Sequence, residues 1–438
     1  MPGVLFQDAR HRIPNLMLRA RVLAHWRKMR MKFNKSGQLL LVSAASLLTA
    51  GLFSACGTNT VDFVYVTSSQ AAGANSYGEI DVLEVNRQSG FMRPIPTSPF
   101  PSGGRNPVAD AVSTDFQNLY VVNEDDNTIV QFIIGSDGKL YPQTTINTPG
   151  IFPLAVTVSG SNLFVLDKYQ PLNTCSTGSP CSGSIAVFPL QAASGTIASG
   201  TPGTPLLNGS LSYWPLILPG NTGHILQPTG ISASPSGADL YITAYDTTAN
   251  TGYVFGFSIN SDGTLKALNA GVPVAAGIHP SAIAGDPSGS YVYVTDATAG
   301  TVLGYSVQSG ALAPLTSGTG GGNSFPAGTQ PSALVVDPSG SFLYVTNFLD
   351  ASVTAYSISA GALTRAGSYP TGLQPVAIGI DPSQQHYLYT VNFLGGNVSG
   401  YEVNSLDGTL INTQSSPYHA NALPTAMAAI PHNTVTTK

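Results

Sequence analysis

The sequence is poor in charged residues, in cysteine and in helical pattern. Only 9% of its 438 residues are charged, against about 25% in an average soluble protein. After residue 56 there are 8 basic and 21 acidic residues, a net charge of −13, and such a surface repels phosphate backbones, so we expect no nucleic-acid partner. Hydrophobic residues make up 42% of the chain, enough for a sizeable core, which excludes disorder over most of its length. No segment after residue 56 shows helical periodicity.

Basic residues gather instead at the N-terminus. Nine of the 17 lie within the first 35 residues, and an apolar run from Leu39 to Phe53 follows. This order is typical of a secretory signal, and the cysteine after the small residues Ser54-Ala55 resembles a bacterial lipobox, which implies a lipid on Cys56. The alternative is an uncleaved membrane anchor, but the run is shorter than the roughly 20 residues that span a bilayer.

The targeting segment therefore covers residues 1–56. If translation starts at Met31, residues 1–30 come from a wrongly assigned start codon and are not part of the signal. We expect export to the bacterial cell envelope (periplasm or outer membrane), with membrane contact through the lipid on Cys56 only. In an exported protein, Cys175 and Cys181 are expected to form a disulfide. A metal site is the less favoured alternative, because no His or third Cys lies near them, and we predict neither metal nor cofactor.

Two sequence marks recur seven times after residue 56. The first is a proline followed by small apolar residues, at Pro107, Pro153, Pro228, Pro280, Pro331, Pro375 and Pro424. The second is an aromatic followed by β-branched or apolar residues, at Tyr65, Tyr120, Phe164, Tyr241, Tyr293, Tyr344 and Tyr389. Six of the seven aromatics follow a proline mark by 11 to 14 residues, and Tyr65 has no such proline before it. Turns such as Asp-Pro-Ser-Gly lie between the marks, and Asp-Gly or Ser-Gly hairpin turns come later in each unit.

Each unit thus predicts four short antiparallel strands, and seven such units predict an all-β, seven-bladed β-propeller. The first unit lacks a proline strand, whereas the last segment, from Pro424, lacks an aromatic strand. We therefore expect the C-terminal strand to complete the first blade and close the ring, which removes its free edges. Residues 57–61 would be a linker, 62–431 the propeller and 432–438 a tail. We expect a monomer.

The units resemble the YVTN-type repeat, most clearly at Tyr293-Val294-Thr295-Asp296 and Tyr344-Val345-Thr346-Asn347. Over residues 61–430 the chain is similar to the lactonase-like seven-bladed propellers, which include a 6-phosphogluconolactonase group and a carboxymuconate-cyclizing enzyme. The resemblance implies His, Arg and Glu side chains in the central channel. Only four Glu follow residue 56, namely Glu79, Glu84, Glu124 and Glu402, and none is beside a proline mark.

The residues before each proline should ring one mouth of the channel. They are Asn106, Phe152, Gln227, His279, Gln330, Gln374 and Leu423. For a lactone reaction, His279 would be the general base, Arg105 the electrophile, and Asn106, Gln227, Gln330 and Gln374 the ligand-binding donors. The alternative is that these side chains only cap loop backbone. A phosphorylated lactone is disfavoured, because no basic cluster is present.

Two other features have alternative interpretations. The acidic run 124–127 suggests calcium, but an Asx-rich hairpin turn explains it better. Likewise, Asn123, Asp167, Asp296, Asn347 and Asn392 share one position after a strand, which favours a repeated turn role. The long unit over residues 169–225, with Trp214 and His224, would be a lid, a partner-binding patch or a loop packed on the propeller side.

Two functions follow from these observations. The sequence favours a non-catalytic envelope module that binds a small molecule, a glycan or a protein. The alternative is a lactonase-like hydrolase that opens an unphosphorylated lactone at the central channel.

Overall fold

The computed structural model describes residues 60–72, 76–192, 194–198, 213–220, 223–382, 386–421 and 423–432. The targeting segment, with Cys56, and residues 433–438 lie outside the described residues. The chain divides between Asn59 and Thr60. No helix in the described ranges is long and apolar enough to cross a membrane.

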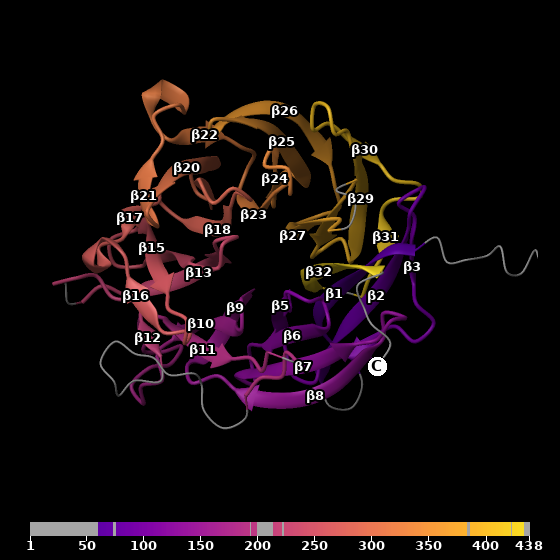
Figure 1. Cartoon of the computed structure of the whole chain (residues 1–438), viewed down its shortest axis with the longest axis horizontal. Helices are drawn as coiled ribbons and strands as arrows, with labels where there is room; N and C mark the ends of the chain where they lie inside the picture. Colours follow the sequence, from indigo (N-terminus) through magenta and orange to yellow (C-terminus); the bar gives the residue numbers. More distant parts are fainter. Residues whose placement is uncertain are drawn as a thin grey trace, which may run out of the picture. The chain divides into compact units, whose positions relative to one another are not determined.

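Seven antiparallel sheets surround one centre (Figure 1). Three have four strands, and in the other four a fifth short strand also pairs with the third strand. Blade 1 contains β32 (Pro424–Pro431), β1 (Thr60–Ala72), β2 (Tyr77–Asn86) and β3 (Met92–Pro94), with β4 (Phe100–Pro101) paired to β2. Blade 2 contains β5 (Pro107–Val112), β6 (Asn118–Asn123), β7 (Thr128–Ile134) and β8 (Leu140–Asn147). Blade 3 contains β9 (Ile151–Ser159), β10 (Asn162–Tyr169), β11 (Ser184–Pro189) and β12 (Trp214–Pro215).

The remaining blades repeat the pattern. Blade 4 contains β13 (Leu226–Ala233), β14 (Asp239–Asp246), β15 (Thr251–Ile259), β16 (Leu265–Ala267) and β17 (Val274–Ala275). Blade 5 contains β18 (Pro280–Gly285), β19 (Tyr291–Asp296), β20 (Thr301–Gln308), β21 (Ala311–Pro314) and β22 (Ser324–Pro326). Blade 6 contains β23 (Pro331–Val336), β24 (Phe342–Asn347), β25 (Ser352–Ser359) and β26 (Ala362–Pro370). Blade 7 contains β27 (Pro375–Ile380), β28 (Tyr387–Asn392), β29 (Asn397–Val403), β30 (Leu410–Asn412) and β31 (Tyr418–His419). Two short 3₁₀ turns occur at Asn269–Gly271 and Thr319–Gly321.

The predicted ring closure is confirmed. β32 pairs with β1, so that Ile430 lies opposite Phe63 and Ala426 opposite Thr67. The N-terminal strand is therefore held between the C-terminal strand and β2. Each proline mark begins, or lies near the start of, an innermost strand, and neighbouring innermost strands contact one another around the whole ring.

The core lies between the blades. Seven hydrophobic clusters are present, and each takes its side chains from two adjacent blades. Second strands such as β24 are buried at every position, which explains why their sequences are almost continuously apolar.

The aromatic marks also join blades through hydrogen bonds. The Tyr293 hydroxyl donates to the Gly361 carbonyl of the next blade at 3.0 Å, and Tyr344 donates to Gly408 at 3.1 Å. The acceptor glycine has a positive φ in these hairpins, 80° at Gly361, a conformation that glycine adopts without steric cost. The repeated tyrosine and the repeated hairpin glycine are therefore two halves of one inter-blade contact.

A hydroxyl after the proline forms a second contact of this kind. Ser281 donates to the Pro331 carbonyl at 2.6 Å, and Ser332 donates to the Pro375 carbonyl at 2.6 Å. At the closure, Thr425 donates to the Pro107 carbonyl at 2.8 Å. The innermost strands are thus linked in the same way at the closure and at later blade junctions.

Candidate functional site

The residues before the proline marks gather at one mouth of the channel, because each innermost strand begins there. Five of the seven have positive φ, namely Asn106, Phe152, Gln330, Gln374 and Leu423. Residues other than glycine rarely adopt this backbone conformation, which costs them about 1–2 kcal/mol. It is maintained because the carbonyl accepts a backbone hydrogen bond, as from Phe348 N–H to Gln330 at 2.9 Å. The mouth is therefore a ring of backbone held by the strands.

His279 lies in this ring at blade 5. Its partly exposed ring packs against Tyr245 of blade 4, with centroids 4.4 Å apart. Nδ1 is buried and makes no hydrogen bond within the described residues. The His279 carbonyl accepts the Ala297 N–H at 2.9 Å, and its own N–H donates to Asp296 at 3.1 Å. The predicted base is thus fixed by its backbone and by one aromatic neighbour.

An open polar cavity of about 750 Å³ lies at the mouth between blades 5 and 6. Its walls include Gln330, Asp350 and Arg365, and Ala297 belongs to the same wall. Ala297 donates to the carbonyl of His279, so the His279 backbone adjoins this wall, whereas its imidazole packs against Tyr245 of blade 4 and is not part of the lining. Asp350 is held by the Thr329 N–H, which donates to its carboxylate at 2.6 Å. A cation, an amide and a carboxylate thus line one space.

Arg105 does not reach this cavity. It belongs to blade 2, which blades 3 and 4 separate from blade 5 around the ring. Its half-exposed side chain is paired with Asp126, and Nε donates to the carboxylate at 2.7 Å. The hydrogen bond that Arg105 donates to Asp126 raises the pKa of Arg105. The structure therefore does not bring together the two predicted catalytic residues, and the arginine at the cavity next to His279 is Arg365.

A glutamate lies beside a proline mark in space although not in sequence. Asn106 Nδ2 donates to Glu124 Oε2 at 2.8 Å. Burial raises the pKa of Glu124, while the charge of Lys168 on blade 3 opposes that rise. The signal was available in the sequence, because a β5–β6 hairpin that pairs Pro107 with Asn123 places the next residue against Asn106. Of the other predicted donors, Gln227 lies on β13 and Gln374 directly precedes β27.

The repeated Asn or Asp after the second strand has the predicted turn role. Asp296 accepts the Ile278 N–H at 2.7 Å, and Asn347 accepts the Gly328 N–H at 2.9 Å. Asp167 accepts the Gly150 N–H at 3.1 Å. In the described residues no group of three or more His, Cys, Asp or Glu could hold a metal ion.

In blade 4 the repeated position opposite the proline is Ala244, and an aspartate follows two residues later at Asp246. Asp246 accepts a hydrogen bond from His224 Nδ1 as well as from the Thr248 and Ala249 amides. Burial alone would raise the pKa of Asp246, but these hydrogen bonds lower it overall. His224 and Asp246 thus form an acid–base pair that the sequence did not reveal, since they are 22 residues apart.

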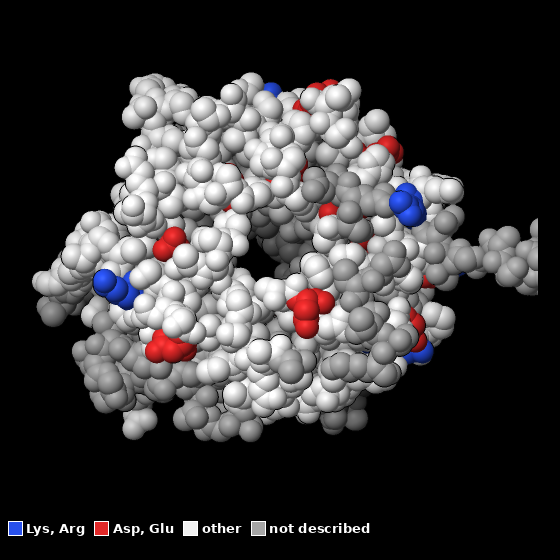
Figure 2. All heavy atoms as spheres, viewed as in Figure 1, with Lys and Arg blue, Asp and Glu red and all other residues white. Residues whose placement is uncertain are grey.

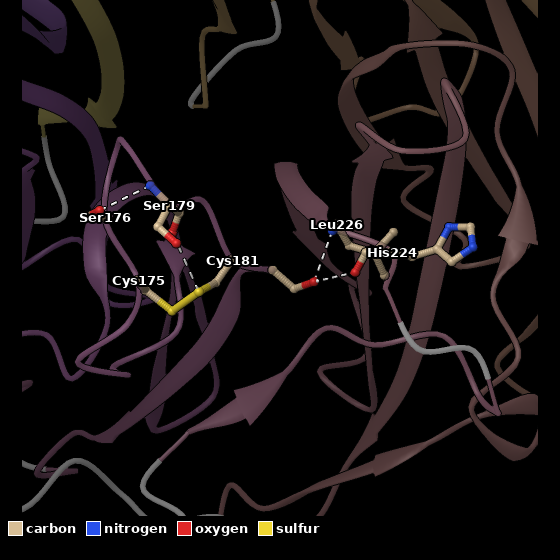
Figure 3. The surroundings of a disulfide bond; sticks show 7 residues. Cys175, Ser176, Ser179, Cys181, His224 and Leu226 are labelled. Carbon is tan, nitrogen blue, oxygen red and sulfur yellow. Dashed lines mark hydrogen bonds between the residues drawn. A yellow bond between two sulfur atoms is a disulfide. The ribbon is translucent and has the colours of Figure 1, made fainter.

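The disulfide loop adjoins the segment that carries His224 (Figure 3). Cys175 and Cys181 are joined by a disulfide. The next residue, Ser182, donates to the His224 carbonyl at 3.3 Å and accepts the Leu226 N–H at 3.0 Å. The loop therefore holds the backbone on which the His224 side chain stands.

The tryptophan of the long unit is part of a blade. Trp214 and Pro215 form β12, the outermost strand of blade 3, and Trp214 packs edge-on against Phe257 with centroids 5.2 Å apart. An apolar cavity of about 220 Å³ lies beside them. The segment belongs to the propeller side rather than to a lid over the mouth, which agrees with the third of the three interpretations. Residues 199–212 lie outside the described residues.

One innermost strand carries an unexpected carboxyl. Asp110 of β5 accepts the Thr67 hydroxyl at 2.6 Å, while its Oδ1 is buried and makes no hydrogen bond. The equivalent positions of the other six blades are apolar, being Val156, Ile231, Ile283, Leu334, Ile378 and Met427. Burial raises the pKa of Asp110 to about 7.

Charge is sparse over the molecule. Figure 2 shows single Lys, Arg, Asp and Glu side chains scattered over a largely uncharged face, with an opening at its centre. Among the described residues on this face, no cluster of basic side chains of the kind that a phosphate group requires is visible.

The comparisons with known proteins agree with this architecture. A family model described as "Lactonase, 7-bladed beta-propeller" matches residues 232–425. A Bacteroides uniformis protein provisionally described as a 6-phosphogluconolactonase is 19% identical, with a TM-score of 0.63 over 85% of this chain and 100% of that one. A Pseudomonas aeruginosa periplasmic gluconolactonase is 18% identical, with a TM-score of 0.63 over 85% of this chain and 99% of that one.

A search of curated proteins found no match. Identities this low establish the fold of the solved relatives and nothing finer. The description of the family model over residues 232–425 agrees better with the lactonase-like alternative than with the ligand-binding module, the two functions that the sequence left open. The comparisons also confirm the resemblance found in the repeats: the chain is similar to the lactonase-like seven-bladed β-propellers, and residues 232–425 match their family model.

Proposed function

We propose that the protein hydrolyses an unphosphorylated lactone at the mouth between blades 5 and 6. The observation that supports this most strongly is the cavity of about 750 Å³, which has Arg365 and Gln330 in its walls and Ala297, bonded to the His279 carbonyl, in the same wall. Ring opening of a lactone requires a base for water and a donor for the developing oxyanion. The cavity walls offer Arg365 and Gln330 as donors, and His279, whose backbone adjoins the wall, is the proposed base.

In the proposed reaction, Arg365 and Gln330 donate hydrogen bonds to the lactone carbonyl oxygen. His279 takes a proton from water, and the water oxygen adds to the carbonyl carbon to give a tetrahedral intermediate. The ring C–O bond then breaks, and the released alkoxide receives the proton from His279. The product is a hydroxy acid, whose new carboxylate pairs with Arg365.

The scarcity of basic side chains supports an unphosphorylated substrate. A phosphate group binds most tightly to clustered Arg and Lys, whereas the cavity has Arg365 alone beside the carboxylate of Asp350. We expect a phosphorylated sugar lactone to be a poor substrate compared with its unphosphorylated counterpart.

The test is hydrolysis of a panel of unphosphorylated lactones by the chain without its first 56 residues. His279→Gln and Arg365→Gln are each expected to lower kcat by about a hundredfold or more. His386→Gln is the matched control, because His386 lies in the loop before β28, at the other end of the strands, and contacts only Glu402 among acidic groups, at 3.0 Å. Comparison of Arg105→Gln with Arg365→Gln tests which of the two arginines takes part in the reaction.

Three results would contradict parts of the proposal. A folded wild-type protein that hydrolyses no lactone would refute the activity. Full activity in His279→Gln, with loss in Asp350→Asn, would move the base to Asp350. Loss in Arg105→Gln, with full activity in Arg365→Gln, would place the reaction at blade 2 instead.

We also propose that the protein is exported and anchored by a lipid on Cys56. The disulfide between Cys175 and Cys181 supports an oxidising compartment. Mass spectrometry of protein from membranes is expected to find a mature chain that begins with acylated Cys56, and Cys56→Ser should release the protein from the membrane. A mature chain that retains residues before Cys56 would refute the anchor.

A further inference from the structure

Three exposed leucines lie at the mouth of blades 6 and 7. Leu349, Leu373 and Leu394 are 57%, 58% and 58% exposed. Leu349 and Leu394 occupy the same place in adjacent blades, since Asn-Phe-Leu follows the second strand in each. Leu373 lies between them, in the link from β26 to β27. We call these three residues the leucine ridge.

Backbone hydrogen bonds connect the segments of the ridge. The Thr371 N–H donates to the Ala351 carbonyl at 2.9 Å, which joins the link to the loop of Leu349. The Gly395 N–H donates to the Leu373 carbonyl at 3.1 Å, which joins it to the loop of Leu394. The three leucines therefore stand on one connected stretch of the mouth, which presents exposed apolar side chains from three adjoining segments.

The ridge begins at the proposed reaction site. Leu349 lines the same cavity as Gln330 and Arg365, so one end of the ridge adjoins the space that would hold the lactone ring. Resting on the proposed function, we infer that the leucine ridge binds an aliphatic chain carried by the lactone. The substrate class is then an alkyl- or acyl-substituted lactone, with its ring in the cavity and its chain along Leu349, Leu373 and Leu394.

The expected dependence of kcat/KM on chain length follows from the partial burial of the aliphatic chain against the leucine ridge. A methylene group that leaves water completely gains about fourfold in binding. On an open ridge each methylene is only about half removed from water and gains about half of the transfer free energy. Each added methylene should therefore raise kcat/KM by about twofold. The gain should come from a lower KM, because the chain binds the ridge equally in the ground state and in the transition state.

The test is a chain-length series of alkyl lactones, from γ-butyrolactone through γ-hexanolactone to γ-decanolactone. Leu349→Ser and Leu394→Ser are expected to abolish the rise in kcat/KM with chain length, while hydrolysis of γ-butyrolactone stays unchanged in Leu394→Ser. Leu406→Ser is the matched control, because Leu406 is 90% exposed and lies in the β29–β30 hairpin, at the other end of the strands.

The outcomes separate the two proposals. If every lactone is hydrolysed with the same kcat/KM whatever its chain, or if Leu406→Ser flattens the series as much as the ridge variants do, the ridge assignment is refuted and the hydrolase stands. If no lactone of any length is hydrolysed, the proposed function itself fails and the ridge assignment fails with it.

Discussion

Replacing Asp110 by asparagine should make the protein more stable, and increasingly so as the pH rises. Asp110 accepts one hydrogen bond, from Thr67, and its Oδ1 is buried without a partner in the structure. Asparagine keeps an acceptor for Thr67 but carries no charge. The change therefore isolates the cost of ionising a carboxyl at an otherwise apolar position between blades.

The magnitude follows from the pKa. Burial raises the pKa of Asp110 to about 7, about 3 pH units above that of an unfolded aspartate. The unfolded chain thus releases this proton at lower pH than the folded chain, so the folded state loses stability from about pH 4 to about pH 7. The full difference is about 4 kcal/mol, and relaxation around the carboxylate would leave about 2 kcal/mol.

The assay is urea unfolding of wild type and Asp110→Asn between acid and mildly alkaline pH. The two proteins should have similar free energies of unfolding near pH 4. At pH 8 the free energy of unfolding of the variant should exceed that of wild type by about 2 kcal/mol or more. Asp262→Asn is the control, because Asp262 lies in an exposed turn where the Thr264 side chain lowers its pKa, so this variant should gain nothing at high pH. A stability difference that is the same at every pH would refute the reasoning.

Three further predictions concern the contacts between and within blades. Tyr293→Phe leaves a buried glycine carbonyl unpaired and should lower the free energy of unfolding by about 1–2 kcal/mol in urea titrations. Ser332→Ala removes the hydroxyl that links two innermost strands and should cost about 1 kcal/mol in the same assay; no loss in either variant would contradict the inter-blade role. Cys175→Ser opens a small loop and should cost about 2 kcal/mol, an effect that a reducing agent must reproduce in wild type but not in the variant.

The fold was predictable from the sequence because every blade repeats the same short sequence motifs. The prolines, aromatics and turn residues recur in register, and the unmatched ends at Phe63 and Pro424 indicated the closure that β1 and β32 make. Repetition makes such marks visible, since each position of the repeat unit occurs in seven blades. The turn role of Asn347 and its equivalents was predictable for the same reason.

The site was less predictable because its residues are the exceptions to the repeat. Arg365 lies on an outer strand, so nothing in the sequence relates it to His279. Glu124 lies beside Asn106 only through the β5–β6 register, and Asp110 replaces an apolar residue in one blade of seven. Chemistry in a propeller is assembled across blades, whereas the sequence pattern describes each blade by itself.

The central claim is that the mouth between blades 5 and 6 opens a lactone ring. The most direct test is the rate of hydrolysis of unphosphorylated lactones by wild type, His279→Gln and Arg365→Gln, each first verified as folded by circular dichroism. We predict turnover in wild type and a loss of about a hundredfold or more in both variants. Turnover that is absent in wild type, or unchanged in both variants, would contradict the account.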